Sequence, residues 1–181
     1  MTEAPTLNPV TLPEDADEWA VLKCHTQQAQ LLIDRLAMFG GAAYYPTFPC
    51  SRRIPRRKAR RTITVAAFPG YVFAAWAGGQ SCRTIWRRAS VPERVLAVRG
   101  EAVTLPRSRL VKLHEAEERW QAPDRSPANF VPEPGARVRF TLGPFEGLTA
   151  TVVKADAWVA KVELDTLKAP AQTPTDALEA V

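Results

Sequence analysis

The feature that most constrains this chain is a proline-dense stretch about two thirds of the way along it. Four prolines fall within twelve residues: Pro123, Pro127, Pro132 and Pro134. Proline can continue neither a helix interior nor the centre of a sheet. Residues 121–134 are therefore predicted to form a semi-stiff, extended linker. This linker divides the 181 residues into a first domain over 19–120 and a much smaller second domain over 135–165.

The first domain is predicted to be mixed, with a small sheet and at least two helices packed on it. Trp19 to Leu22 is a short apolar run that is typical of a buried strand, and residues 26–39 have apolar side chains at helical spacing. Strand-prone runs follow at 62–65 and 68–76, and a second helix is predicted from Ser108 to about Trp120.

The second domain is predicted to consist of strands. Val138, Phe140 and Leu142 alternate with polar residues, and this period of two indicates a half-buried strand. Residues 158–164 supply another strand-prone run. Only about thirty residues separate Gly135 from Asp165, and a domain this small is marginal by itself. We therefore expect a trimmed unit, a unit that leans on the first domain, or one that folds fully with a partner.

Both ends of the chain are expected to lie outside these domains. Residues 1–18 combine prolines and acids with little apolar surface, so they are predicted to be a disordered acidic tail. Residues 166–181 are likewise expected to be a disordered tail.

The charge is unevenly distributed along the chain. The formal net charge is +5, with −5 on residues 1–18, +12 on residues 19–125 and −2 on residues 126–181. A basic body of this kind favours association with a polyanion, the alternative being a basic surface that only maintains solubility. No run approaches the roughly 18 apolar residues of a membrane span, and the acidic start is unlike a signal peptide. We expect a cytoplasmic protein without membrane association.

The densest basic run extends from Arg52 to Arg61, with seven positive charges in ten residues and no acid. Self-repulsion at this density predicts a mobile hairpin loop. No base-reading motif accompanies the run, so DNA or RNA is expected to be contacted through its backbone. The predicted nucleic-acid contacts are Arg52, Arg53, Arg56, Arg57, Lys58, Arg60 and Arg61; the alternative is a solvated loop.

Nothing in the sequence predicts catalysis. His25 and His114 lie in no nucleophile or metal motif, and Glu117 and Glu118 lie on adjacent helix faces, where their carboxylates cannot converge on one atom. No CxxC pair occurs among the three cysteines, which we expect to be reduced packing residues: Cys24, Cys50 and Cys82. We therefore expect a monomeric binding protein and not an enzyme, with no metal or cofactor.

Two segments punctuated by Gly and Pro carry a resemblance to a known family. They are Phe68-Pro69-Gly70-Tyr71-Val72-Phe73 and Gly143-Pro144-Phe145-Glu146-Gly147-Leu148. Together with the opening Trp19-Ala20-Val21-Leu22, the pair Tyr45-Pro46 and the linker, they resemble the NusG family of transcription elongation factors over roughly residues 19–165. The first part resembles an NGN domain and the second a KOW domain, although Ala150 stands where a KOW signature usually has glycine. The resemblance implies an α+β fold, in which an NGN-type mixed α/β sandwich is joined by the linker to a small SH3-like β-barrel.

The resemblance also implies a function. Such a factor binds the clamp helices of RNA polymerase and modulates elongation, pausing, antitermination or termination, either as a general factor or as a specialised RfaH-like paralogue. Its barrel recruits either the termination helicase Rho or a small-subunit ribosomal protein. The alternative is a KOW-containing RNA- or ribosome-binding protein that does not bind polymerase.

The same resemblance assigns the candidate site residues. The implied polymerase-binding residues are Tyr44, Tyr45, Phe68, Pro69, Gly70 and Tyr71. The implied partner-binding residues of the second domain are Phe145 and Leu148, because an aromatic residue at the tip of a Gly-Pro turn is hard to bury. For the aromatic residues the alternative is a role in the core.

Overall fold

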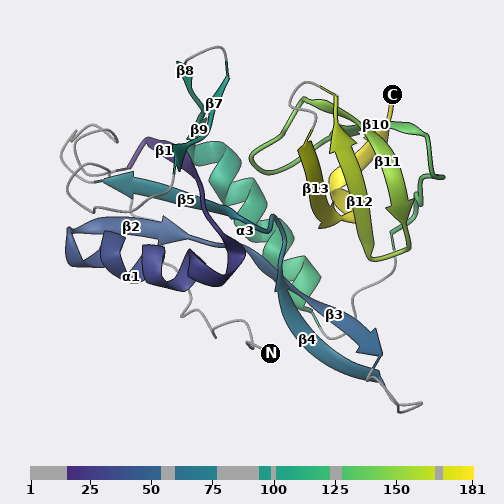
Figure 1. Ribbon diagram of the computed structural model, residues 1–181, viewed down its shortest axis with the longest axis horizontal. Coiled ribbons are helices and arrows are strands. Elements are labelled where there is room, and N and C mark those ends of the chain that lie inside the picture. The colour runs from purple at the N-terminus through teal and green to yellow at the C-terminus, as the bar shows by residue number, and fades with distance from the viewer. Residues whose placement is uncertain (1–15, 54–59, 77–93, 99–100, 123–127, 166–168) are drawn as a thin grey trace.

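The computed structural model describes residues 16–53, 60–76, 94–98, 101–122, 128–165 and 169–181. Two antiparallel five-stranded sheets organise it, one in each domain (Figure 1). The first-domain elements are β1 Glu18–Lys23, the 3-10 turn η1 Thr26–Gln28, α1 Ala29–Met38, β2 Gly41–Tyr44, β3 Thr47–Arg53, β4 Arg60–Ala66, β5 Tyr71–Trp76, β6 Arg94–Val95, β7 Ala97–Val98, β8 Glu101–Ala102, β9 Thr104–Pro106 and α3 Arg107–Gln121.

The first sheet lies between two helices. Its strand order is β2-β5-β1-β6, and β9 pairs with the first half of β1. On β1, Val21 belongs to the cluster that contains Leu110 and Leu113 of α3, whereas the next residue, Leu22, belongs to the cluster that contains Leu36 of α1. Because successive strand residues point to opposite faces, α3 and α1 cover opposite sides of the sheet. This double coverage explains why the opening apolar run is continuous rather than alternating.

The predicted helices are present with small differences. Residues 26–39 form η1 followed by α1, and Phe39 is 46% exposed instead of joining the core face. The second helix begins at Arg107, after Pro106 rather than a Ser108 cap, and it includes Gln121, the first residue of the predicted linker.

The basic run is not simply a loop. Strands β3 and β4 pair from Thr47 with Ala66 out to Arg53 with Arg60, and the hairpin projects from the first domain (Figure 1). Arg52 and Arg61 form one of these pairs, so the expectation of a loop over 52–61 is wrong for the flanks of the run. Strand pairing that starts in the β-prone base continues outward because each added pair satisfies further backbone groups. Residues 54–59, with Arg56, Arg57 and Lys58, lie outside the described residues.

The second domain is larger than predicted. Its elements are β10 Arg137–Phe140, β11 Thr149–Ala155, β12 Val159–Leu164, β13 Ala169–Pro174, the 3-10 turn η3 Thr175–Ala177 and β14 Leu178–Ala180, in the sheet order β13-β12-β11-β10-β14. The expected disordered tail at 166–181 is therefore wrong over 169–180. Strand β13 pairs along the whole of β12, β14 pairs with β10, and Ala177 and Leu178 are buried.

The sequence did not predict the last strands because β13 contains two prolines, which are unusual in a strand. Pro170 and Pro174 argue against a central strand, but β13 is at the edge of its sheet, where a missing N–H is tolerated. Closing the domain with residues 169–180 also removes the expected shortage of strands. At the other end of the chain, Ala16 is buried and Glu18 already belongs to β1, so the predicted tail ends earlier than residue 18. Residues 1–15 lie outside the described residues.

A buried carboxylate fastens α3 to the strands on its side of the sheet. Glu117 accepts hydrogen bonds from the Tyr44 hydroxyl at 2.6 Å, from the Thr47 backbone N–H at 2.7 Å and from the Thr47 hydroxyl at 3.1 Å. The amide of Gln121 donates a further bond at 3.1 Å. Burial and, next, the negative charge of Glu117 raise the pKa of Tyr44 above its usual range. Glu117 thus has a structural role, while its neighbour Glu118 faces solvent.

We predict that Glu117→Gln lowers the free energy of unfolding by about 2–3 kcal/mol. The substitution replaces a charged acceptor with a neutral amide, and the N–H₂ group of that amide faces hydrogen-bond donors that it cannot satisfy. Urea denaturation of the full chain measures the change. Glu118→Gln, on the exposed face of the same helix, is the matched control and should change stability by no more than about 0.5 kcal/mol. Equal effects of the two substitutions would contradict the role given to Glu117.

Candidate functional site

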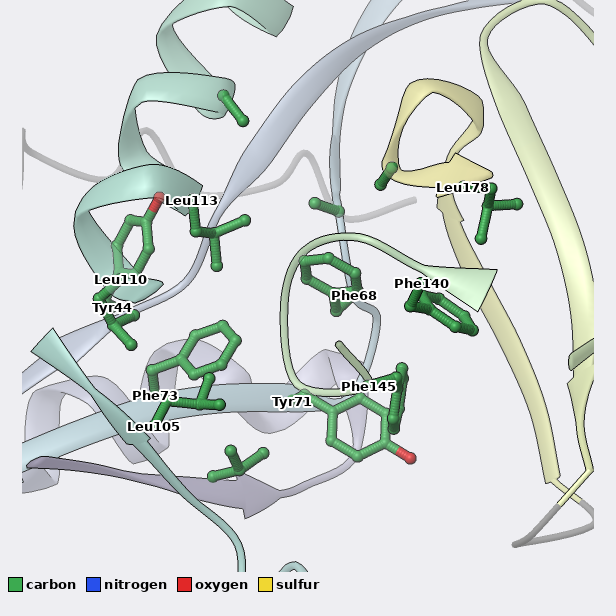
Figure 2. Packing of buried hydrophobic residues seen from close by; sticks show 14 of the residues in the cluster. Tyr44, Phe68, Tyr71, Phe73, Leu105, Leu110, Leu113, Phe140, Phe145 and Leu178 are labelled. Atoms are coloured by element: carbon green, nitrogen blue, oxygen red, sulfur yellow. The ribbon is translucent and has the colours of Figure 1, made fainter. Parts of the chain in front are cut away.

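The two domains meet at an aromatic cluster. Phe145, in the turn between β10 and β11, lies edge-on against Tyr71 with ring centroids 4.9 Å apart, and it also contacts Phe68 at 6.5 Å and Phe140 at 5.4 Å. Figure 2 shows Phe145 beside Phe140, with Phe68 and Tyr71 approaching from the first domain. Edge-to-face contacts of this kind are favourable beyond the area that they bury. The cores of the two domains are therefore continuous through Phe145.

The approach of the turn depends on Gly143. Its φ of +87° favours glycine, and a Cβ built on it would lie 2.2 Å from Cζ of Phe68. The ring of Phe68 is itself only 1% exposed, so it has little room to move away. Gly143 is thus needed at this position for backbone conformation and for contact between the domains.

Two polar contacts flank the aromatic cluster, and both reach the second domain from α3. The guanidinium Nε of Arg109 lies 3.5 Å from Oε2 of Glu146, and Nε1 of Trp120 donates a hydrogen bond of 3.0 Å to Oδ2 of Asp176. The side chains of the ion pair are 45% and 25% exposed, and such pairs contribute at most about 1 kcal/mol. These contacts orient the domains, while the apolar cluster supplies most of the stabilisation.

The structure separates the residues assigned to polymerase binding. Tyr44 is buried against Glu117, and Tyr45 is buried in the α1 cluster, where burial and then Cys24 raise its pKa to about 12. Only Phe68 and Tyr71 come together at the domain interface, with Pro69 half-buried and Gly70 buried between them. Burial also raises the pKa of Tyr71. One shared surface made of all six residues is therefore not what the structure shows, and the role of each in polymerase binding stays a prediction.

The expectation that Phe145 is exposed at its turn is wrong. The residue is 1% exposed because Phe68 and Tyr71 of the first domain cover it, and Leu148 is half-buried. Partner binding by either residue stays a prediction. For the basic run, the structure describes the strand backbone at Arg52, Arg53, Arg60 and Arg61, so nucleic-acid contact by the run also stays a prediction.

Sequence reasoning missed the polar residues of the interface: Arg109, Trp120, Glu146 and Asp176. These pairs lie 37 and 56 positions apart in the chain, and no periodicity links residues at such separations. The Gly-Pro turn was the available signal, since glycine often marks a close approach of backbone to another group.

No protein-family model matches the chain, and no curated protein matches it either. Similar solved structures include one on domain interaction in Thermotoga maritima NusG, at 16% identity over 91% of this chain and 97% of that one, with a TM-score of 0.42. Conformations A and B of the MjSpt4:Spt5 complex are also similar, each at 16% identity over 90% of this chain and over 97% and 96% of theirs, with TM-scores of 0.27 and 0.30. At these sequence identities and TM-scores, the structural similarity gives no information about function.

Within the described part of the chain, His, Cys, Asp and Glu side chains form no group of three or more that could hold a metal ion. Among the helices of the same residues, none is both long and apolar enough to cross a membrane.

We predict that Gly143→Ala separates the domains, because the new methyl group meets the ring of Phe68 only while the domains are in contact. Small-angle scattering, or the distance between fluorophores placed on the two domains, should report a more extended chain. Gly147→Ala is the matched control: its φ of +83° imposes a similar strain of about 1–2 kcal/mol, but no atom lies within 4 Å of its added Cβ. Identical scattering from the two variants would show that the contact does not depend on the close approach at Gly143.

Proposed function

We propose that this chain is a NusG-like transcription factor that binds the RNA polymerase clamp and modulates elongation. One observation carries the proposal: two aromatic residues that the second domain covers, Phe68 and Tyr71, directly follow the base of the projecting β3–β4 hairpin, whose outer end carries the basic run. We propose that these aromatic residues, once uncovered, contact a protein and that the neighbouring ribbon contacts a nucleic-acid backbone.

The physical character of the two parts suits these roles. Aromatic side chains give large contact area at a small entropic cost, which is why they serve as interface anchors. A basic ribbon without base-reading groups holds phosphates and so positions the protein without sequence selectivity. The proposed role requires no catalysis by the chain itself.

The position of the second domain adds a condition to polymerase binding. Phe145 covers Tyr71 and Phe68, so the clamp helices can reach these residues only after the second domain moves away. The apparent affinity for polymerase is then reduced by the fraction of molecules that are open. The same movement uncovers Phe145, which we propose as a contact for the partner of the second domain, Rho or a small-subunit ribosomal protein.

The direct test measures binding of the labelled full chain to RNA polymerase free of nucleic acid, with isolated clamp helices as competitor. We expect binding that the clamp helices abolish. Gly143→Ala should bind more tightly than the wild type because more of its molecules are open, and Gly147→Ala should match the wild type.

Failure of both the wild type and Gly143→Ala to bind polymerase, with salt-sensitive RNA binding retained, would favour the RNA- or ribosome-binding alternative. Gly143→Ala is essential to this reading, because a tightly closed wild type could fail to bind for a conformational reason alone.

The basic run makes a separate prediction about nucleic acid. If it neutralises about four phosphates, log affinity for duplex DNA should fall with log salt concentration at a slope of about −3.6. Replacing Arg56, Arg57, Arg60 and Arg61 with Ser should flatten the slope, as measured by fluorescence anisotropy over a salt series. An unchanged slope would remove the hairpin from the nucleic-acid interface.

A further inference from the structure

A groove of about 320 Å³ runs between the two domains beside the aromatic cluster. Phe68 and Tyr71 line it from the first domain, and Phe145, Val153, Lys161 and Gln172 line it from the second domain. Because the walls come from both domains, the groove exists only while the domains are in contact. Its lining is mainly apolar, with a cation and an amide at one side.

One lysine, Lys161, lines the second-domain side of this groove, and a second, Lys154, lies opposite it in the strand ladder, beside the groove. Lys154 of β11 and Lys161 of β12 are direct neighbours in the strand ladder, and both are exposed. Like charges placed opposite each other destabilise a strand pair. Within the part of the chain that the structure describes, no ion pair joins either lysine to an acid, although Glu163 lies two residues further along β12.

An irregularity in β11 turns an apolar side chain toward the same region. The pairing with β12 shifts register between Val152 and Lys154, so Val153 and Lys154 are both exposed although they are consecutive. Bulges of this kind commonly re-aim side chains at functional sites. Here the shift leaves Val153, at 58% exposed, beside an uncompensated positive charge.

The neighbouring edge strand limits how a partner can bind. In β13, every second residue points its backbone N–H away from β12, and Pro170, Gln172 and Pro174 occupy these positions. The two prolines have no N–H, so Gln172 alone among these three residues offers a backbone N–H on the outer edge of the strand. So short a run of free backbone groups does not support addition of a long strand, and an occupant must be recognised through its side chains.

We propose that this groove binds an acidic, hydrophobic peptide segment of a partner protein. Carboxylates of the segment lie on Lys154 and Lys161, and its apolar side chains contact the exposed apolar residues of the groove, Val153 and Pro170. Charge complementarity at the two lysines and the apolar lining select this chemistry together. A nucleic acid fits less well, because Phe68, Tyr71 and Phe145 are buried and leave no ring face on which bases could stack.

The occupied groove stabilises the closed arrangement. A ligand that binds one of two conformations shifts the equilibrium toward it. Such a peptide therefore opposes the opening that uncovers Phe68 and Tyr71. Its competition with polymerase rests on the proposed function, whereas binding of the peptide itself does not.

The test uses the full chain and a short fluorescent peptide in which Asp and Glu alternate with Leu and Phe. Anisotropy should show saturable binding that is lost when the acids of the peptide are replaced with Gln. The double substitution Lys154→Gln, Lys161→Gln should weaken binding by about tenfold, since an exposed charge pair contributes a factor of roughly three to five. Lys112→Gln, which removes an exposed lysine of α3, is the matched control and should leave the affinity unchanged.

Two further measurements test whether the groove requires domain contact and whether it prefers a peptide to a nucleic acid. Gly143→Ala, which opens the domains, should weaken peptide binding even though all the lysines remain. Oligothymidylate of equal charge should bind no better to the wild type than to the double lysine variant. The two lysines are exposed, so circular dichroism of the double variant is expected to match the wild type.

The proposal is overturned if the peptide does not bind, if Lys112→Gln weakens binding as much as the double substitution, or if the double variant binds unchanged. Binding of oligothymidylate through Lys154 and Lys161, in place of the peptide, would overturn it in favour of a nucleic-acid surface. Because polymerase does not enter these measurements, their failure leaves the proposed function untouched.

Discussion

The insertion of Phe145 between Phe68 and Tyr71 determines how the rest of the molecule is arranged. It converts a small sheet domain and a larger mixed domain into one body with a continuous apolar core. The contact depends on backbone as much as on side chains, because Gly143 lets the turn approach Phe68 more closely than any other residue would. The polar contacts from α3 to Glu146 and Asp176 then fix the orientation around this apolar centre.

The core of the first domain does not depend on the second domain, so the proposed uncovering of Phe68 and Tyr71 requires no refolding. This core lies on both faces of β1 and β5, and Glu117 holds α3 to β2 and β3 independently of the second domain. Phe68 and Tyr71 lie at the end of that core, at the turn into β5, where a second domain or another protein can cover them. The proposed opening therefore changes how the domains are placed and leaves the fold of each domain unchanged.

The fold of the first domain could largely be read from local patterns. The run at Trp19, the helical spacing after Thr26 and the β-prone segment from Phe68 each leave a local signature. The last strands could not be predicted in this way, because Pro170 and Pro174 indicate an unstructured segment unless it is known that β13 lies at the edge of its sheet. The burial of Phe145 was equally inaccessible, since its covering residues are more than seventy positions earlier in the chain. Local patterns reveal elements, whereas contacts between domains depend on a register that only the assembled sheets define.

The hydrogen bond from Trp120 to Asp176 has a practical consequence. Trp120 is 2% exposed, and its indole lies on the boundary that separates when the domains part. Trp19, by contrast, is buried in the first-domain core on β1. If the domains part as proposed, the Trp120 indole becomes hydrated and its emission shifts toward longer wavelength. The chain has five tryptophans, so this shift is read as a change in their summed emission. The movement can be followed in unlabelled protein, in real time and in the presence of a partner that lacks tryptophan.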